Sequence, residues 1–342
     1  MNGEFIEALD QIEKEKGIDK DVLLEAIEAA LISAYKRNFS TAQNVKVKVN
    51  RETGEVKVYA SKVVTENPKN ECLEIDIDEA KSINRDLTVG DIIDIEVTPK
   101  KFGRIAAQTA KQVVVQRIRE AERGIIYKEF IEKENEIVTS MIQRIEKKTV
   151  FVDLGKAEGI LTAAEQVPTE EYKVNDRLKI YILDVKKTTK GPQILVSRSH
   201  PGLVKRLFEM EVPEIQEGIV QIKGIAREAG SRTKIAVHSI DESIDPVGSC
   251  VGHKGTRVQK IVDELRGEKI DIIKWSQDPA EYIASALSPA KVLSTEADEE
   301  EKTARVVVDE QQLSLAIGKE GQNARLAAKL TGWKIDIKSQ SF

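Results

Sequence analysis

The chain has 342 residues, of which 40% are hydrophobic and 32% are charged. Such a length exceeds one ordinary domain and indicates several folded domains of roughly 100 residues each, and the mixed composition argues against disorder and against a coiled coil. The formal net charge of −5 at pH 7 differs from the basic excess that indiscriminate nucleic-acid binders usually carry. Any contact with nucleic acid must therefore be local.

The sequence carries no sign of export or of a membrane span. Cys72 and Cys250 are its only cysteines, too few for a disulfide framework or a zinc site, and a reducing compartment suits them. The N-terminus is acidic where a signal peptide needs a basic start, and no run approaches the roughly 18 apolar residues that cross a bilayer. We expect a cytoplasmic protein with no membrane partner.

The first 128 residues change between helical and strand-like periods. Apolar residues from Val22 to Tyr35 recur at the spacing of a buried helix stripe, and alternation on both sides of the Thr53–Gly54 turn predicts a hairpin with one solvated face. A mixed α+β N-terminal domain over residues 1–128 follows. Its expected elements are two helices within 1–40, strands at 45–49, 56–58 and 92–97, and a helix from about 102 to 123.

The segment 132–199 contains five short strand-like runs separated by turns. Five such runs in about 60 residues are typical of a small five-stranded OB-type β-barrel. In such a barrel Phe151 is either a stacking platform for RNA bases or a core residue, with Lys186 and Arg198 as phosphate contacts. The runs are 137–145, 149–154, 159–161, 178–185 and 193–197.

Beyond residue 199 the chain repeats itself. Val251–Gly255 is matched by Ile317–Gly321, 66 residues later, and Gly267–Ile272 is matched by Gly332–Ile337, 65 residues later. Each copy reads helix, strand, strand, helix, Gly-x-x-Gly, helix, strand, so the sequence predicts two tandem type II KH domains, over 200–276 and 277–342. The acidic run 298–301 is expected to be a solvated hairpin loop.

A Gly-x-x-Gly turn between two helices lets the backbone approach a phosphate closely, and the next helix start offers unpaired N–H groups to the same anion. Because the turn occurs twice in one element order, we expect both copies to bind RNA. The candidate residues are Gly252, His253, Lys254, Gly255 and Arg257 in the first copy, and Gly318, Lys319, Glu320, Gly321, Gln322, Asn323 and Arg325 in the second.

A basic stretch precedes the barrel. The segment from Thr98 to Arg119 holds six cations, Lys100, Lys101, Arg104 and Lys111 among them, and no acid. Such a helix face either steers RNA or docks an acidic partner, or it is simply solvated surface.

Catalytic patterns are missing from the sequence. Gly318–Lys319 is followed by Glu320 where a P-loop needs Ser or Thr, and the three histidines have no metal-ligand partner at usable spacing. Asp76 and Asp78 are interpreted as a strand end and a helix cap. We therefore expect no catalytic residues, no metal and no cofactor, and a protein that is not an enzyme.

With these motifs the chain resembles, end to end, the NusA family of bacterial transcription factors. The matching segments are Glu25–Leu31 running into Ala34–Arg37, Phe102–Gln112, Ala226–Val237, Asp245–Gly252 and Gly321–Ala327.

The resemblance implies a monomer whose N-terminal domain binds core RNA polymerase near the RNA exit channel, and an S1-type barrel and KH pair that bind nascent single-stranded RNA. Pausing, intrinsic termination and antitermination would be modulated, with other Nus antitermination factors as further partners. It also implies that Arg227, Arg232 and Lys234 flank the first RNA groove. The residues implied to contact polymerase or exit-channel RNA are Lys36, Arg37, Lys100, Lys101, Arg104 and Lys111.

Two other functions remain open from the residues. Barrel and KH modules also accompany phosphorolytic nucleases, although residues 1–125 are short for a catalytic domain. A ribosome-assembly factor is the other alternative, and it would sediment with ribosomal subunits rather than with polymerase.

Overall fold

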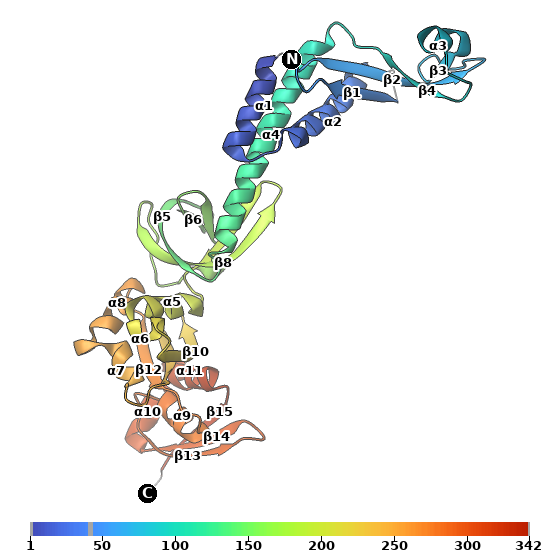
Figure 1. Ribbon diagram of the computed structural model, residues 1–342. Helices are drawn as coiled ribbons and strands as arrows, with labels where there is room; N and C mark the ends of the chain where they lie inside the picture. Colours follow the sequence, from blue (N-terminus) through green and yellow to red (C-terminus); the bar gives the residue numbers. More distant parts are fainter. Residues whose placement is uncertain (1–2, 40–43, 341–342) are drawn as a thin grey trace. The chain divides into compact units, whose positions relative to one another are not determined.

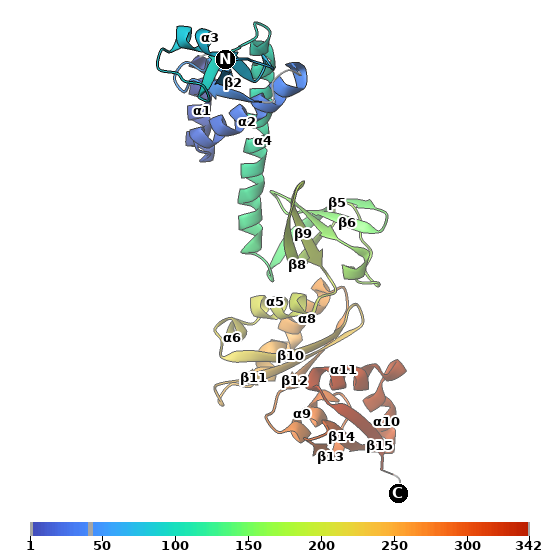
Figure 2. The same ribbon diagram turned by 90° about the vertical axis from the view of Figure 1, so that its right-hand side faces the viewer.

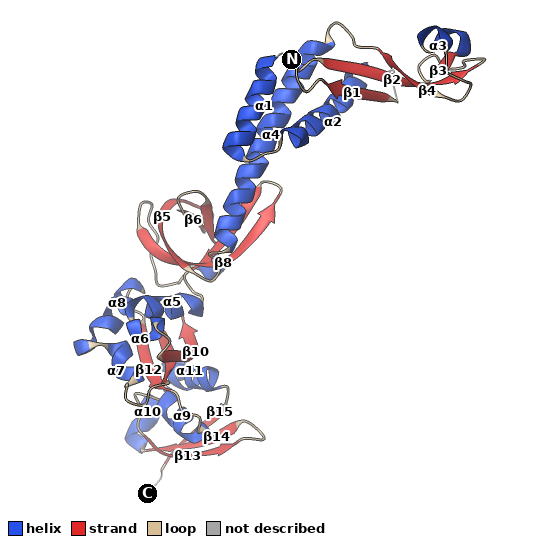
Figure 3. Cartoon of the chain, in the orientation of Figure 1, coloured by secondary structure: helices blue, strands red, loops and turns tan. Residues whose placement is uncertain are grey.

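The computed structural model describes residues 3–39 and 44–340 (Figure 1). It divides into two compact units, residues 1–125 and residues 126–342. Helices and strands alternate along both units, as the colouring of Figure 3 shows.

The first unit is the mixed α+β domain that the sequence predicts. The predicted hairpin is confirmed, since β1 and β2 pair antiparallel with Val47 opposite Val58. The elements are α1 (Gly3–Lys16), α2 (Lys20–Phe39), β1 (Val45–Val49), β2 (Val56–Thr65), β3 (Glu74–Asp76), α3 (Ile77–Ile83), β4 (Ile92–Glu96) and α4 (Phe102–Ile131), whose last turns belong to the second unit.

Strand β2 organises this unit because it is long enough to serve two cores. It pairs with β1 and β4 near its start and middle, and with β3 at its end. The larger core lies among α1, α2, β1 and the first turns of α4, where Phe102, Ala106 and Ala110 are fully buried. A smaller core forms around Val64 and Ile75 beneath α3.

The acidic pair in the small core is structural, as the sequence predicts. Asp76 ends β3 and caps α3, because its carboxylate accepts a hydrogen bond from the N–H of Asp78 at 2.9 Å. Such a cap satisfies one of the N–H groups that a helix start leaves unpaired.

The second unit begins with the predicted five-stranded barrel. Its strands close in the order β5-β6-β7-β9-β8, and the alternating inward residues, such as Val150 and Val152, form its core. Phe130, at the end of α4, is 2% exposed and packs into the same core. The strands are β5 (Ile137–Glu146), β6 (Thr149–Asp153), β7 (Glu158–Leu161), β8 (Arg177–Thr188) and β9 (Gly191–Ser197).

Two KH modules follow the barrel. In each one the first two strands are antiparallel and the last strand is parallel to the second. The first module consists of α5 (Pro201–Glu211), α6 (Pro213–Gln216), β10 (Val220–Glu228), β11 (Arg232–Ser239), α7 (Pro246–Val251), η2 (His253–Gly255), α8 (Thr256–Glu264) and β12 (Lys269–Lys274).

The second module repeats this order, except that in the described structure no helix stands between α9 and β13 where the first module has α6. Of the acidic run 298–301, residues 299–301 lie in the turn between β13 and β14 as predicted, whereas Asp298 ends β13. Its elements are α9 (Pro279–Ala286), β13 (Val292–Asp298), β14 (Thr303–Val308), α10 (Glu310–Ile317), η3 (Lys319–Gly321), α11 (Gln322–Thr331) and β15 (Lys334–Ser339).

The two KH modules share a packed interface. Helix α11 of the second module packs against β10 and β11 of the first (Figure 2), where Leu330 lies beside Gly224. Ala236 and Ile273 of the first module belong to the same apolar cluster as Ile283 and Val306 of the second. Burial of this apolar surface holds the modules together.

Candidate nucleic-acid interface

The two Gly-x-x-Gly loops have the same backbone conformation. Gly252 has φ 74° and ψ 174°, and Gly318 has φ 76° and ψ 171°. The third residue of each loop is left-handed although it is not glycine, with φ 51° at Lys254 and 53° at Glu320. The sequence repeat is therefore also a repeat of loop geometry.

The first glycine of each loop cannot be replaced without a clash. A methyl group at Gly252 would lie 2.7 Å from Cγ of Arg257, and one at Gly318 would lie 2.8 Å from the backbone N of Asn323. Both glycines also have the positive φ that side chains disfavour. Close packing against the following helix therefore requires glycine here.

Both loops deliver the chain into the start of a helix. Gly255 and Gly321 are the N-cap positions of α8 and α11, and neither helix has a side-chain cap within the described part of the chain. The first N–H groups of each helix and its dipole can therefore attract an anion. Lys254 and Lys319 are exposed, and neither has an ion-pair partner among the described residues.

A groove of about 360 Å³ runs between the two modules. The first module lines it with Ser231, Arg232 and Lys269, and the second lines it mainly with Gly318 and Lys319. Arg232 is held by Asp271, with its Nε 2.6 Å and its Nη2 2.8 Å from the two carboxylate oxygens. The groove thus brings cations of the first module to the loop of the second.

Three cations that the sequence assigns to RNA contact are buried instead. Arg198 and Lys234 are 1% and 0% exposed, and Arg227 is 6% exposed. Each is paired with a carboxylate, and burial of an unpaired charge would cost far more. We therefore revise these three assignments, since the side chains are buried and paired within the protein rather than exposed on its surface.

These buried pairs join neighbouring modules. Arg198 donates to Glu170 of the barrel at 3.0 Å and to the carbonyl of Glu264 at the end of α8. Arg227 donates from Nη1 to the carbonyls of Arg198 and His200, where the barrel leads into the first KH module. Lys234 donates to the carbonyl of Ser288 in the second module at 2.6 Å.

Burial and pairing balance differently for the two buried groups Glu268 and Lys234. Burial acts to raise the pKa of Glu268, but hydrogen bonds from Arg227, Thr233 and the N–H of Gly230 outweigh it, so the pKa lies below its ordinary value. For Lys234 the balance is reversed, because burial lowers its pKa more than Asp271 raises it.

In the barrel, the ring of Phe151 is covered by the guanidinium of Arg144. Phe151 is half-buried on β6, and the guanidinium carbon of Arg144 lies 3.9 Å from its ring centroid. Arg144 also forms ion pairs with Glu146 on its own strand, β5, and with Glu158 on β7. A base that stacks on Phe151 must first displace this cation. Lys186, on β8, is paired with Asp184.

Comparison with known proteins identifies the family. The model of the NusA N-terminal domain matches residues 4–124, that of the S1 RNA binding domain matches 132–197, and those of the NusA-like first and second KH domains match 198–275 and 279–341. The transcription termination/antitermination protein NusA of Halalkalibacterium halodurans is 64% identical over 341 residues, covering 100% of this chain and 89% of that protein. The chain belongs to the NusA family.

A second relative agrees with this assignment: the Bacillus subtilis protein of the same name is 62% identical over 341 residues, covering 100% of this chain and 92% of its own. A solved structure is also similar to part of the chain. The solution structure of the N-terminal domain of NusA from B. subtilis is 62% identical and covers 36% of this chain and 99% of that one, with a TM-score of 0.33.

The predicted resemblance and fold class are thus confirmed: a NusA N-terminal α+β domain, an OB-type S1 barrel and two KH domains. As a member of the NusA family the chain is a transcription termination/antitermination factor. In the described part of the chain, no helix is both long enough and apolar enough to span a bilayer.

The predicted polymerase- or RNA-contacting residues of this NusA-family chain lie on one unit. Lys36 and Arg37 are exposed in the last turns of α2, whereas Lys100 and Lys101 precede α4. Arg104 and Lys111 are exposed on α4, two turns apart and on the same side, since seven residues make almost two full turns. None of these six side chains has an ion-pair partner among residues 3–39 and 44–340.

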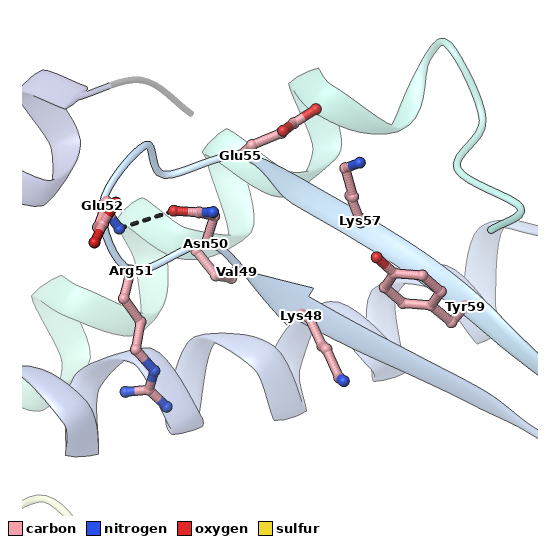
Figure 4. Close-up of a pocket in the computed structure, with 8 residues that line it drawn as sticks. All are labelled: Lys48, Val49, Asn50, Arg51, Glu52, Glu55, Lys57 and Tyr59. Carbon is pink, nitrogen blue, oxygen red and sulfur yellow. Dashed lines mark hydrogen bonds between the residues drawn. The ribbon is translucent and has the colours of Figure 1, made fainter. Parts of the chain in front are cut away.

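The same unit carries a surface hollow of about 640 Å³ on its hairpin (Figure 4). Lys48, Arg51, Lys57 and Tyr59 are among its lining residues. Arg51 pairs with a carboxylate of α2 and Lys57 with one of β4, while Lys48 lies over the Tyr59 ring. Because most of its charge is balanced, we assign no ligand to this hollow.

Sequence reasoning missed one residue at the second NusA loop. Glu228, on β10 of the first module, accepts hydrogen bonds from Nε of Arg325 at 2.7 Å and from the amide of Gln322 at 2.8 Å. The hydrogen bond from Arg325 holds the pKa of Glu228 below its usual range. The partners are more than 90 positions apart, so no local pattern signals the contact.

Proposed function

We propose that this chain is a transcription elongation factor that binds RNA polymerase through its N-terminal domain and nascent single-stranded RNA through its KH domains. It thereby modulates pausing, intrinsic termination and antitermination. The observation that carries the RNA half is the duplicated loop, with matching backbone angles and two helix starts that lack side-chain caps in the described structure.

The proposed RNA contacts are the exposed members of the predicted set. Backbone N–H groups after Gly255 and Gly321 would donate hydrogen bonds to RNA phosphates, and Lys254 and Lys319 would add positive charge beside them. The groove between the modules supports an extension of the RNA path from the second loop to the first module, because it is lined by Lys319 on one side and by Arg232 and Lys269 on the other.

The barrel has a smaller part in this proposal. Its platform at Phe151 is closed by Arg144, so stacking must displace a cation that two carboxylates hold. We propose that its main role is to orient the first KH module through the Arg198 pairs. Since Phe130 belongs to the barrel core, we also propose that the barrel unit begins at about residue 126 rather than at 132.

The N-terminal domain is proposed as the anchor on polymerase. Six of its cations have no ion-pair partner among the described residues and suit either an acidic protein surface or RNA at the exit channel: Lys36, Arg37, Lys100, Lys101, Arg104 and Lys111. Anchoring there would raise the effective concentration of the KH loops at emerging RNA to the millimolar range that short tethers give. Loops that bind free RNA weakly would then suffice.

The RNA half is tested by the salt dependence of binding. In the full chain, Lys254→Gln and Lys319→Gln should each weaken binding of single-stranded RNA and reduce the slope of log K against log salt by about 0.7. Lys205→Gln, at an exposed site on α5, is the matched control and should leave the slope unchanged. Unchanged slopes in both loop variants would refute the clamp. The RNA should also stay full length with phosphate and magnesium present, since no catalytic role is proposed.

A further inference from the structure

The second residue after each loop directs its hydrogen bonds into the protein, although Asn323 also lines the groove between the modules. This residue is Arg257 in the first KH module and Asn323 in the second, and both were candidates for RNA contact on sequence grounds. Asn323 is 4% exposed, and the side chain of Arg257 is 30% exposed. Their hydrogen bonds lead into the protein.

Arg257 connects three parts of the first module. Its Nη1 donates to the carbonyl of Ser249, in the last turn of α7, at 2.6 Å. The same nitrogen lies 2.9 Å from a carboxylate oxygen of Glu214 on α6. Its aliphatic stem fills the space that a side chain at Gly252 would need. The guanidinium charge is therefore already neutralised within the module.

Asn323 makes the equivalent connection in the second module. Its Nδ2 donates to the carbonyl of Ala316, near the end of α10, at 3.0 Å and to that of Leu287, just after α9, at 2.9 Å. A longer bond, of 3.4 Å, reaches the carbonyl of Leu315. Gly318 packs against its backbone and Cβ, as Gly252 packs against Arg257.

The two connections correspond position by position. Ser249 and Leu315 stand at the same offset as the loops themselves, and each lies in the helix that enters the loop. Glu214 and Leu287 both follow the first long helix of their module. In both copies, the second residue after the loop thus links the helix that follows the loop to the helix that precedes it. The donor is a guanidinium in the first module and an amide in the second.

The backbone strain of the loops explains why such a link between the two helices is needed. Each loop holds a residue other than glycine in the left-handed region, Lys254 or Glu320, and side chains disfavour that conformation. A strained loop persists only where its surroundings fix it. The hydrogen bonds of Arg257 and Asn323 fix the distance between the two helix ends that the loop must span.

We propose that Arg257 and Asn323 are positioning residues: they hold the two Gly-x-x-Gly loops in the conformation that receives RNA phosphates, and they do not contact RNA themselves. The inference rests on the proposed function, in that RNA binds at these loops. It assigns the direct contacts to the loop backbone and to Lys254 and Lys319 instead.

The test separates position from contact by using the full chain and a labelled single-stranded RNA. Arg257→Leu keeps the stem but removes the donors, so RNA affinity should fall about tenfold with no change in salt slope. Arg257→Lys can still donate to Ser249 and pair with Glu214, and it should restore most of the affinity. Asn323→Ala should give a similar loss, again at constant slope.

Hydrogen exchange of residues 252–255 and 318–321 without RNA supplies the second readout. We expect faster exchange at the first loop in Arg257→Leu and at the second loop in Asn323→Ala, and no change at the untouched loop. If Arg257→Leu does not fold, Arg257→Gln allows the same comparison.

The outcomes are distinguishable. A salt slope reduced by about 0.7 in Arg257→Leu, with unchanged exchange, would make Arg257 a phosphate contact and overturn the proposal. Faster hydrogen exchange in Arg257→Leu with unchanged RNA affinity would show that Arg257 stabilises the loop but that RNA does not bind there. That result would contradict both the positioning role and the proposed RNA binding at the loops. If Lys254→Gln nevertheless loses RNA affinity, the proposed function stands and only the positioning role is contradicted.

Discussion

Loss of one partner of the buried pair of Arg227 and Glu268 should strongly destabilise the first KH module. Both side chains are 1% exposed, and the carboxylate of Glu268 accepts four hydrogen bonds. Glu268→Gln keeps the shape but removes the charge and turns one acceptor into a donor that faces other donors. Breaking a buried pair in this way costs about 3–5 kcal/mol of unfolding free energy.

This cost is measurable because both tryptophans, Trp275 and Trp333, lie in the KH modules. Their fluorescence in urea should show an early transition for Glu268→Gln in the full chain. Glu171→Gln, in a pair whose side chains are 72% and 80% exposed, is the control and should unfold like the parent. A loss of unfolding free energy below about 1 kcal/mol for Glu268→Gln would show that the buried charge contributes little to stability.

The same pair predicts a dependence on pH. Because the pKa of Glu268 is lowered on folding, its charge stabilises the fold above the pKa of the unfolded chain, and that contribution is lost as pH falls through the lowered folded value. The difference in stability between the parent and Glu268→Gln should therefore be full at pH 7 and shrink in acid. A constant difference from pH 7 to pH 3 would contradict this sign.

Three further predictions concern other parts of the chain. Glu320→Lys gives the second loop a lysine at the position that Lys254 holds in the first loop, on the same backbone conformation. RNA affinity should therefore rise and the slope of log K against log salt should steepen by about 0.7, as filter binding at several salt concentrations would measure. Replacing Arg104 and Lys111 by Glu should shorten a hairpin-dependent pause in a transcription assay while polymerase capture persists, and an unchanged pause lifetime would exclude these contacts. Burial raises the pKa of Cys250 to about 12, so at pH 8 iodoacetamide should modify exposed Cys72 and reach Cys250 only after unfolding, as mass spectrometry of the labelled peptides would show.

Hydrophobic periodicity was enough to predict most elements. The five barrel strands and the repeated KH order follow from apolar patterns of a few residues, which depend on local spacing. Element ends were less predictable, because tertiary contacts set them. Strand β2 runs to Thr65 rather than Val58 since a second core covers its end, and α4 continues to Ile131 because Phe130 packs into the barrel.

The site was predictable to the extent that it is a backbone motif. Glycines at fixed offsets identify both loops, and the structure gives them one conformation. The role of each cation was not predictable, because a lysine or arginine in the sequence carries no sign of its partner. Arg227 meets Glu268 across 41 positions, and Arg325 meets Glu228 across 97, so burial and neutralisation appear only in three dimensions.

We propose that one unit of the chain holds polymerase while the other holds RNA. Residues 1–125 and 126–342, purified separately, should be tested for capture of core RNA polymerase and of labelled single-stranded RNA. We expect the first to capture polymerase and the second to bind RNA in a salt-sensitive way. Capture of polymerase by neither fragment, with RNA still bound by the second, would contradict the proposed anchor and leave only an RNA-binding protein.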